Sequence, residues 1–168
     1  MELVEGRPQD KRIDKEERVY DLLDQLNIDY QRIDHEEANT MEVCLEIEKT
    51  LKSTICKNLF LVNSNKSQYY LLMLKENKKF KTKVISKQIN SSRLSFGSDE
   101  KMLEYLDITP GSVSLLGLMN DHDFKVQLLM DKDLLQDEYL GCHPCINTSS
   151  LRIKMKDVFE KIHTIPSS

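Results

Sequence analysis

Side chains of the kinds that take part in catalysis gather in one short segment, Gly141 to Ser150, with the sequence GCHPCINTSS. His143 can accept or donate a proton near neutral pH. Asn147 and Thr148 offer donors and acceptors that can hold a carbonyl, a ribose hydroxyl or a water molecule. Pro144 stiffens the turn that aims these groups. The segment therefore predicts a site that positions a polar substrate.

A second group of candidates lies upstream. Lys57 sits inside an apolar run from Ile55 to Leu61, so one strand face would hold its charge against the core side of a sheet, where an unpaired charge is costly. The loop from Gly111 to Gly117 can bring its backbone amides close to a ligand, because glycine has no side chain. Together with His143 and Asn147, these groups suit positioning and charge stabilisation, and no protein nucleophile is evident.

Other kinds of site have weaker support. Cys142 and Cys145 show the two-residue gap of zinc sites and redox dithiols, but a structural zinc site needs four ligands, and Cys44 and Cys56 lie far upstream. NTSS follows the second thiol where a dithiol enzyme has a helix. No phosphate-binding glycine motif and no serine on a sharp elbow is present. We expect no metal and no other cofactor, with a cysteine-based metal or redox protein as an open alternative.

Composition sets the class of protein. A chain of 168 residues suffices for one domain that buries about two-thirds of its unfolded surface. Charged residues make up 31% and hydrophobic residues 39% of the chain, which fits a globular protein with a solvated exterior. No apolar run approaches the roughly 18 residues of a membrane span, and the start lacks the apolar core of a signal peptide. We therefore expect a cytoplasmic protein with no membrane partner.

Basic residues are concentrated locally, although the net charge is −4. That net charge argues against unspecific nucleic-acid binding, which depends on many basic contacts. Lysines gather between Lys75 and Lys87, and a smaller basic group comprises Arg152, Lys154 and Lys156. Such a run forms either a solvated loop or a face that meets phosphates. If RNA is the partner, we expect the first cluster to lie on the pocket side.

Hydrophobic spacing predicts alternating helices and strands. Helices are expected over 14–27, 40–51, 84–90, 98–108 and 155–163, with Thr40 and Ser98 as N-caps of the second and fourth. Strands are expected over 28–34, 54–64, 68–74 and 125–131, the second and third as a hairpin. Residues 109–121 read as a loop followed by a strand, and 134–141 as irregular. Residues 1–13 are expected to be a flexible lead-in to a single mixed α/β domain over 14–165.

Three segments resemble one known family in the same order along the chain. They are CKNLFL around Lys57, SRLSFGSDEKMLEYLDITPGSVSLLGL from Ser92 to Leu118, and HPCINTSSLRI from His143 to Ile153. The family is that of prolyl-tRNA editing proteins, the YbaK-like deacylases, and the resemblance is strongest to its freestanding alanyl-tRNA(Pro) deacylases. It implies an α/β domain with a mixed, curved sheet surrounded by helices. It also implies hydrolysis of a mischarged aminoacyl ester on tRNA(Pro).

The resemblance also implies roles for particular residues. In family members, the lysine that matches Lys57 is required for activity, and a glycine-rich loop that matches residues 111–115 contacts the amino-acid end of the substrate. We expect two catalytic residues, Lys57 and His143. The expected substrate-binding residues are Asn58, Gly111, Ser112, Val113, Ser114, Leu115, Asn147 and Thr148. Met41 and Cys44 are expected as pocket walls, with core packing as the alternative.

The implied substrate is alanine on tRNA(Pro), attacked by a water molecule with help from a vicinal ribose hydroxyl. Leu115 departs from the family, whose loop has proline there, and this places loop shape and the admitted amino acid in question. Cysteine or another small amino acid is an alternative substrate, and a noncatalytic tRNA- or synthetase-binding homologue is an alternative to an enzyme. Expected partners are the acceptor end of tRNA(Pro), and prolyl-tRNA synthetase or an elongation factor.

Overall fold

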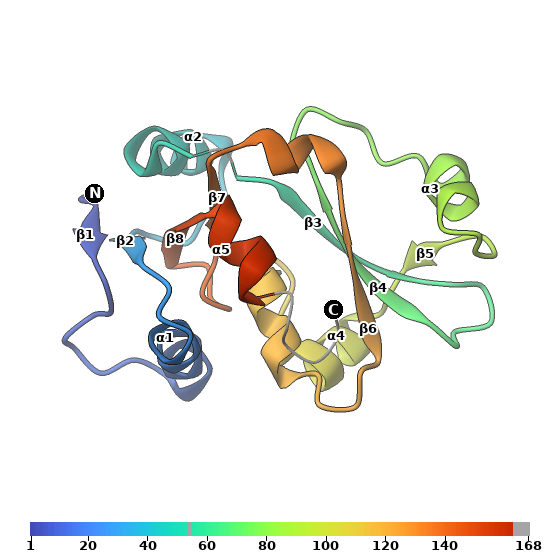
Figure 1. The fold of residues 1–168 in the computed structure, drawn as a ribbon, viewed down its shortest axis with the longest axis horizontal. Helices are drawn as coiled ribbons and strands as arrows, with labels where there is room; N and C mark the ends of the chain where they lie inside the picture. Colours follow the sequence, from blue (N-terminus) through green and yellow to red (C-terminus); the bar gives the residue numbers. More distant parts are fainter. Residues whose placement is uncertain (54, 163–168) are drawn as a thin grey trace.

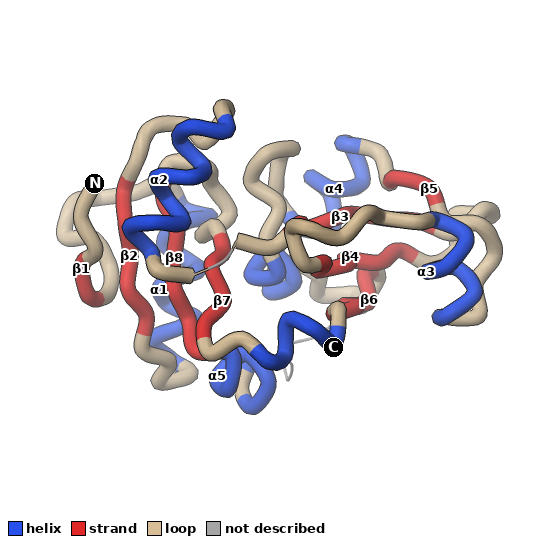
Figure 2. The backbone as a smooth tube through the Cα atoms, turned by 90° about the horizontal axis from the view of Figure 1, so that it is seen from above, coloured by secondary structure: helices blue, strands red, loops and turns tan. Residues whose placement is uncertain are grey.

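A computed structural model describes residues 1–53 and 55–162. Within these residues the strands form two four-stranded sheets, which occupy opposite halves of the molecule (Figures 1 and 2). The fold is a single mixed α/β domain, as the sequence predicts, but its strands are divided between two sheets instead of forming one curved sheet. In the described part of the chain, no helix combines the length and the apolar character that crossing a bilayer requires.

The first sheet is antiparallel throughout. Its strands, in spatial order, are β1 (Val4–Glu5), β2 (Tyr30–Asp34), β8 (Ser149–Lys154) and β7 (Tyr139–Cys142). Three helices lie in the same half of the molecule (Figure 2): α1 (Asp14–Gln25), α2 (Met41–Leu51) and α5 (Met155–Glu160). Val43 and Ile47 on α2 pack against Ile33 of β2, which fixes the helix over one face of this sheet.

The second sheet is mixed. Its strands, in spatial order, are β5 (Ser95–Phe96), β3 (Lys57–Val62), β4 (Tyr69–Leu74) and β6 (Val126–Met130). The hairpin of β3 and β4 is antiparallel, as predicted, whereas β6 runs parallel to β4. The chain between β4 and β6 carries α3 (Thr82–Gln88) and α4 (Asp99–Leu106).

One shared core joins the two halves. Leu71 and Met73 of β4 belong to the same buried cluster as Leu151 and Ile153 of β8. A parallel bridge between Ile55 and Gly141 lies outside the named strand pairs and connects the segment before β3 with β7. The two sheets are therefore parts of one folding unit that meet at the beginning of β3.

The two faces of β3 have different surroundings, because successive side chains in a strand point to opposite sides. Phe60 and Val62 lie in the shared core. Leu59 and Leu61 pack in a second cluster with residues of α3. By the same alternation, Asn58 shares the core face and Lys57 shares the face toward α3. This division decides where the predicted site residues lie.

Both predicted N-caps are confirmed. The Thr40 hydroxyl accepts a hydrogen bond from the Val43 amide at 3.3 Å, and the Ser98 hydroxyl accepts one from the Lys101 amide at 3.1 Å. These bonds satisfy amides that the first turn of a helix leaves unpaired. Lys52 then ends α2 in a left-handed conformation, with φ of 55°.

Two segments differ from the sequence prediction. The strand expected after Pro110 is a 3-10 helix, η1 (Leu115–Asn120), whose N-cap Ser114 accepts a hydrogen bond from the Leu116 amide at 3.2 Å. Gly117 permits this packing, because a β-carbon there would lie 2.4 Å from the Ile108 side chain. Residues 134–141, predicted as irregular, contain the end of η2 (Lys132–Gln136) and most of β7.

Residues 1–13, predicted as a flexible lead-in, contain β1, in which Val4 pairs with Arg32 of β2. Arg7 forms an ion pair with Glu17 on α1 at 2.7 Å, and Arg12 forms one with Asp34 at 3.0 Å. These contacts attach the segment to the domain. The last three residues of the predicted domain, 163–165, lie outside the described residues.

Candidate active site

A cavity of about 200 Å³ lies where the two sheets meet. Its lining residues are Ile55, Cys56, Asn58, Gly111, Val113, Cys142 and His143. They come from the start of β3, the loop after Pro110 and the end of β7. Four of them, Asn58, Gly111, Val113 and His143, are predicted site residues, so the structure brings part of the predicted set together. Pockets for drug-sized ligands measure about 300–1,000 Å³, so this cavity suits a smaller group.

His143 presents a neutral imidazole to this cavity. Its Nδ1 lies 3.0 Å from the Ser149 carbonyl oxygen, which can only accept, so Nδ1 carries the proton and Nε2 keeps a lone pair. Burial lowers the pKa of His143, and the nearby His35 lowers it further, against the opposing effect of the Ser149 carbonyl. At neutral pH, Nε2 is therefore a hydrogen-bond acceptor.

A second histidine, His35, is linked to His143 through the Ser150 hydroxyl. The Ser150 hydroxyl lies 3.4 Å from His143 Nδ1 and 2.9 Å from His35 Nε2, while His35 Nδ1 donates to the Glu36 carbonyl at 2.7 Å. The two imidazole rings are 6.3 Å apart between centroids. Neither His35 nor Ser150 is among the residues that the sequence predicts for the site. The signal for His35 is its place directly after β2, whose last residue pairs with Ser149.

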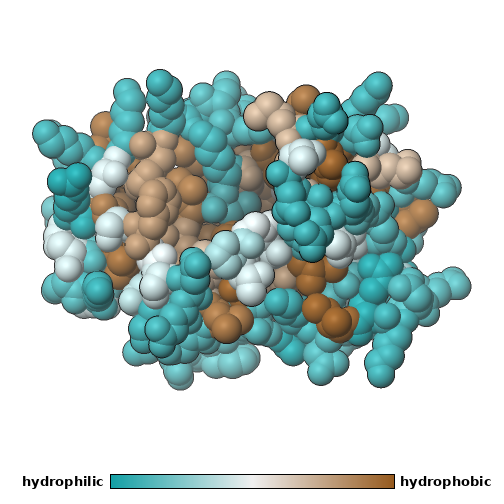
Figure 3. Space-filling model, turned by 180° about the vertical axis from the view of Figure 1, so that it is seen from behind, coloured by the Kyte–Doolittle hydropathy of each residue, from teal (hydrophilic) through white to brown (hydrophobic). Residues whose placement is uncertain are grey.

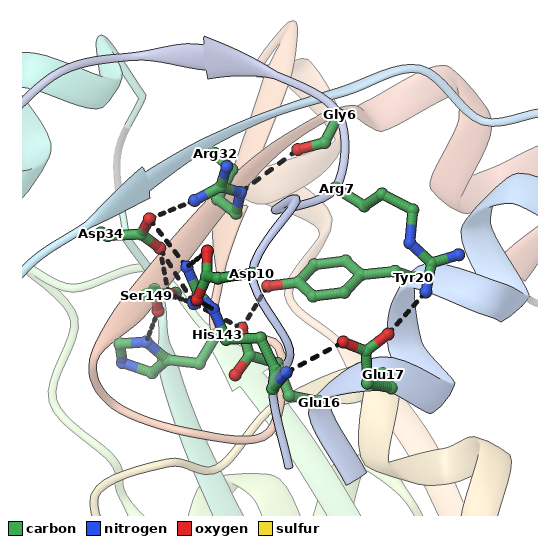
Figure 4. Close-up of polar contacts among 11 residues, drawn as sticks. Gly6, Arg7, Asp10, Glu16, Glu17, Tyr20, Arg32, Asp34, His143 and Ser149 are labelled. Carbon is green, nitrogen blue, oxygen red and sulfur yellow. Dashed lines mark hydrogen bonds and ion pairs between the residues drawn. The ribbon is translucent and has the colours of Figure 1, made fainter. Parts of the chain in front are cut away.

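An ionic network holds the other side of Ser149 (Figure 4). The Ser149 hydroxyl donates to Asp34 at 2.6 Å, and Arg12 contacts both groups, at 3.3 Å to the hydroxyl and 3.0 Å to the carboxylate. Burial alone would raise the pKa of Asp34, but hydrogen bonds from Arg12, Arg32 and Ser149 together hold it well below its usual range. Asp34 is therefore ionised, and Ser149 is fixed on both sides.

The same arginine reaches a buried carboxylate. Glu16, only 2% exposed, accepts hydrogen bonds from Arg12 at 2.9 Å and from the Tyr20 hydroxyl at 2.5 Å. Burial and this carboxylate raise the pKa of Tyr20, so its hydroxyl remains a donor. Arg12 therefore has partners on α1, β2 and β8, namely Glu16, Asp34 and Ser149. The N-terminal segment therefore stabilises the strand that carries Ser149.

The cysteines near the cavity are protonated. Burial raises the pKa of Cys56 and of Cys145 to about 12 each, and burial also raises that of Cys142. A protonated thiol is a poor nucleophile and a poor metal ligand. The Cys56 thiol lies 3.8 Å from the Asn58 side-chain oxygen, and the Asn58 amide nitrogen lies 3.4 Å from the Cys56 carbonyl. These contacts orient the Asn58 amide at the cavity wall.

The loop after Pro110 divides between cavity and core. Gly111, with φ of +92°, and Val113 line the cavity, and a β-carbon at Gly111 would lie 3.7 Å from the Asn147 amide nitrogen. Asn147 therefore lies beside the cavity rim. The remaining predicted loop residues are buried and are absent from the cavity lining: Ser112, Ser114 and Leu115.

Lys57 is not brought together with His143. Its ammonium donates to the Lys78 carbonyl at 2.5 Å, on the face of β3 toward α3. Thr148 is exposed beside a separate hollow that Arg12 also lines. Met41 is 79% exposed and Cys44 is half-buried, and neither lines the cavity. The lysines expected on the pocket side instead lie in and around α3, across the second sheet from the cavity.

Comparison with known proteins identifies relatives. The family model of the aminoacyl-tRNA editing domain matches residues 35–161. The prolyl-tRNA editing protein ProX of Acetoanaerobium sticklandii is 33% identical over 150 residues, which are 89% of this chain and 91% of that protein. The prolyl-tRNA synthetase associated domain-containing protein 1 of Danio rerio is 25% identical over 148 residues, covering 87% of this chain and 80% of that protein.

The fold has counterparts among solved structures. A crystal structure described as that of a candidate trans-editing enzyme for prolyl-tRNA synthetase superposes with a TM-score of 0.69, covering 89% of this chain and 92% of that one at 15% identity. The family model spans most of the chain, including every residue that lines the cavity. The chain therefore belongs to the aminoacyl-tRNA editing domain family.

Proposed function

We propose that this protein hydrolyses the ester that joins a small, mischarged amino acid, foremost alanine, to tRNA(Pro). The observation that carries the proposal is the 200 Å³ cavity lined by Asn58, Gly111, Val113 and His143. The names of the relatives, a prolyl-tRNA editing protein and a synthetase-associated domain protein, supply the class of substrate. A cavity of this size admits a small side chain, so selection acts by exclusion of larger ones.

The chemistry requires an oriented water and support for charge on the carbonyl oxygen. Water adds to the ester carbon, the bond to the ribose oxygen breaks, and that oxygen takes a proton as the amino acid leaves as a carboxylate. The Asn58 amide and the backbone amides near Gly111 can donate to the developing oxyanion. His143 Nε2 can accept a hydrogen bond from the attacking water or from the vicinal ribose hydroxyl, which orients it for the reaction.

Lys57 is assigned to the ester end of the substrate, through the terminal phosphate or the carbonyl. In the present arrangement its ammonium is bound to the Lys78 carbonyl. The assignment therefore requires the side chain to release that carbonyl when RNA binds. A lysine has four rotatable bonds and one compact charge, which makes such an exchange of partners feasible at a strand end.

The position of Lys57 also favours a second candidate function, a noncatalytic module that binds tRNA or a synthetase. One assay separates the two. Purified protein is incubated with tRNA(Pro) charged separately with alanine, cysteine, serine and proline, and the ester that remains is measured over time. Hydrolysis of the alanyl ester above the spontaneous rate, with the prolyl ester spared, supports editing. Binding of tRNA(Pro) without hydrolysis of any ester would instead establish the binding module.

A further inference from the structure

A groove of about 450 Å³ lies on the other face of the second sheet, between β4, β6 and α3. Apolar side chains form much of its lining: Leu72, Leu74, Val84, Ile85, Ile89, Leu129 and Met130. Its other lining residues are Lys78, Lys79, Lys81, Gln88, Asp131 and Lys132. We call this surface, with Phe80 and Phe96 beside it, the lysine groove. Figure 3 shows apolar side chains exposed among hydrophilic ones on the half of the molecule that carries α3.

Charge is strongly segregated toward this groove. Six lysines and one glutamate give residues 75–87 a formal charge of +5, which leaves −9 for the rest of a chain whose total is −4. Four lysines and one carboxylate, Asp131, are the charged residues in the groove lining, and Lys78 pairs with Asp131 at 2.8 Å and with the nearby Asp133 at 2.5 Å. An anion approaching the molecule therefore meets favourable potential mainly here.

Several lysines around the groove hold no acidic partner. Within the described part of the chain, no ion pair involves Lys79, Lys81, Lys83, Lys87 or Lys132. The first two and Lys132 line the groove itself, whereas Lys83 and Lys87 stand one turn apart on α3. Unpaired ammonium groups around an apolar floor suit a ligand that carries several negative charges as well as flat, weakly polar surfaces.

Aromatic rings complete the pattern. Phe80, between two of these lysines in sequence, lies 5.8 Å from Phe96 between ring centroids, and Phe96 is 65% exposed. Phe80 is half-buried, so Phe96 is the ring that is open to a base. An exposed aromatic ring among lysines is a combination by which proteins hold single-stranded nucleic acid, since bases stack on the ring and phosphates meet the ammonium groups. A regular duplex offers no free base faces to such a surface.

We propose that the lysine groove binds the single-stranded 3′ end of the substrate RNA, next to the aminoacylated nucleotide; this inference rests on the proposed function. Continuity with the cavity supports it. Lys78, at the groove, accepts the hydrogen bond of Lys57, and the next residue, Asn58, lines the cavity on the opposite face. The RNA strand passes around the start of β3, so that Lys57 meets the backbone at the turning point.

Charge reversal in the groove tests the proposal. In Lys79→Glu/Lys81→Glu, KM for alanyl-tRNA(Pro) rises about tenfold or more relative to KM for 3′-O-alanyl-adenosine, which is too short to reach the groove. The plot of log K for RNA binding against log salt concentration becomes shallower by about 1.4 in slope. Each phosphate contact with a single strand contributes roughly 0.7, and the variant loses two contacts. Phe96→Ala weakens RNA binding about fivefold or more through lost stacking.

The matched control is Lys154→Glu/Lys156→Glu, two exposed lysines at the start of α5. This control leaves the ratio of the two KM values unchanged. If the ratio of the two KM values changes more in the control than in Lys79→Glu/Lys81→Glu, the proposal is overturned. The RNA would then bind in the half of the molecule that carries β8 and α5. If neither substrate is hydrolysed, the proposed function fails. Fluorescence anisotropy with an uncharged single-stranded 3′ oligonucleotide then still tests whether the groove binds RNA. An unchanged affinity in Lys79→Glu/Lys81→Glu rejects the groove, and a lost affinity supports it.

Discussion

His143 Nδ1 lies 3.0 Å from the carbonyl oxygen of Ser149, and this contact decides what the imidazole offers to the cavity. A carbonyl oxygen cannot donate, so the proton stays on Nδ1 and the lone pair on Nε2. The Ser149 hydroxyl is bound in turn by Asp34 and Arg12. One serine thus orients the imidazole through its backbone while its side chain is part of an ionic network.

Activity should depend on neutral His143. The lowered pKa predicts that kcat/KM for alanyl-tRNA(Pro) falls on acidification with a midpoint below the ordinary value of 6.5. Folding stability should fall in the same window, because between the native pKa and the unfolded value the unfolded chain binds more protons. His143→Ala should lower kcat by about 10²–10⁴ and remove this acidic limb. If the fall of kcat/KM at acidic pH persists unchanged in His143→Ala, a group other than His143 causes it.

His35 should act on His143 through Ser150. His35→Ala removes the acceptor 2.9 Å from the Ser150 hydroxyl, and the freed hydroxyl can then donate to Nδ1 of the His143 tautomer that carries its proton on Nε2. We expect kcat to fall roughly tenfold with little change in KM. Nitrogen-15 NMR of the imidazoles should show a mixture of His143 tautomers, and His35→Gln should restore part of kcat. A single unchanged tautomer in His35→Ala would rule out this coupling.

Lys57→Ala should abolish most activity without unfolding the protein. In its proposed role the ammonium stabilises the ester end, and we expect its removal to cost about 10²–10³ in kcat. Lys66→Ala is the matched control, because Lys66 is exposed in the turn between β3 and β4 of the same hairpin. Steady-state kinetics and circular dichroism are measured for both. Parent-level hydrolysis by Lys57→Ala would show that the lysine only ties β3 to the Lys78 segment.

Enlarging the cavity should relax selectivity. Val113→Ala removes two methyl groups from the wall of a 200 Å³ cavity, which reduces the exclusion of the proline ring. Hydrolysis of prolyl-tRNA(Pro) should rise about tenfold relative to alanyl-tRNA(Pro), since one or two methylenes are worth about 1–3 kcal/mol. Leu103→Ala, at an exposed position on α4, is the control. An unchanged ratio of the two rates would mean that Val113 does not limit the amino acid.

Arg12→Ala should destabilise the fold. It leaves Glu16, a buried carboxylate, with the Tyr20 hydroxyl as its remaining hydrogen-bond donor, and it removes a partner of Asp34. Breaking a buried pair in this way costs about 3 kcal/mol or more. Urea denaturation measures the free energy of unfolding, with Arg93→Ala, at an exposed position, as the control. Equal losses in the two variants would show that the N-terminal segment adds no stability.

Helix starts could be predicted from the sequence because the signal lies within a few neighbouring residues. Thr40 and Ser98 are caps with acidic residues in the following turn, and both helices begin where these signals place them. The prediction of a strand after Pro110 is wrong, because the apolar residues there pair with no other strand. Ser114 caps a 3-10 turn there, and Leu115 enters the core. Periodicity alone cannot distinguish such a buried turn from a strand.

The candidate site was only partly predictable, because some of its residues are brought together by contacts between distant parts of the chain. His143 and the loop at Gly111 can be recognised by residue type and resemblance. His35 joins the site because β2 pairs with β8, and Arg12 joins it through side-chain contacts with both strands. The direction of Lys57 depends on the register of β3, and a shift of one residue would exchange its face with that of Asn58. A sequence read one position at a time contains no direct record of such pairing.

The bridge between Ile55 and Gly141 places the cavity at a joint, because its walls belong partly to one sheet and partly to the other. The shared core packs against both sheets, so it sets how far apart the two sides of the cavity lie. For the proposed editing reaction, the size of the admitted amino acid then depends on this packing as well as on the residues of the cavity wall. If the proposed function holds, we expect substitutions in the shared core, remote from the cavity lining, to change which aminoacyl esters are hydrolysed.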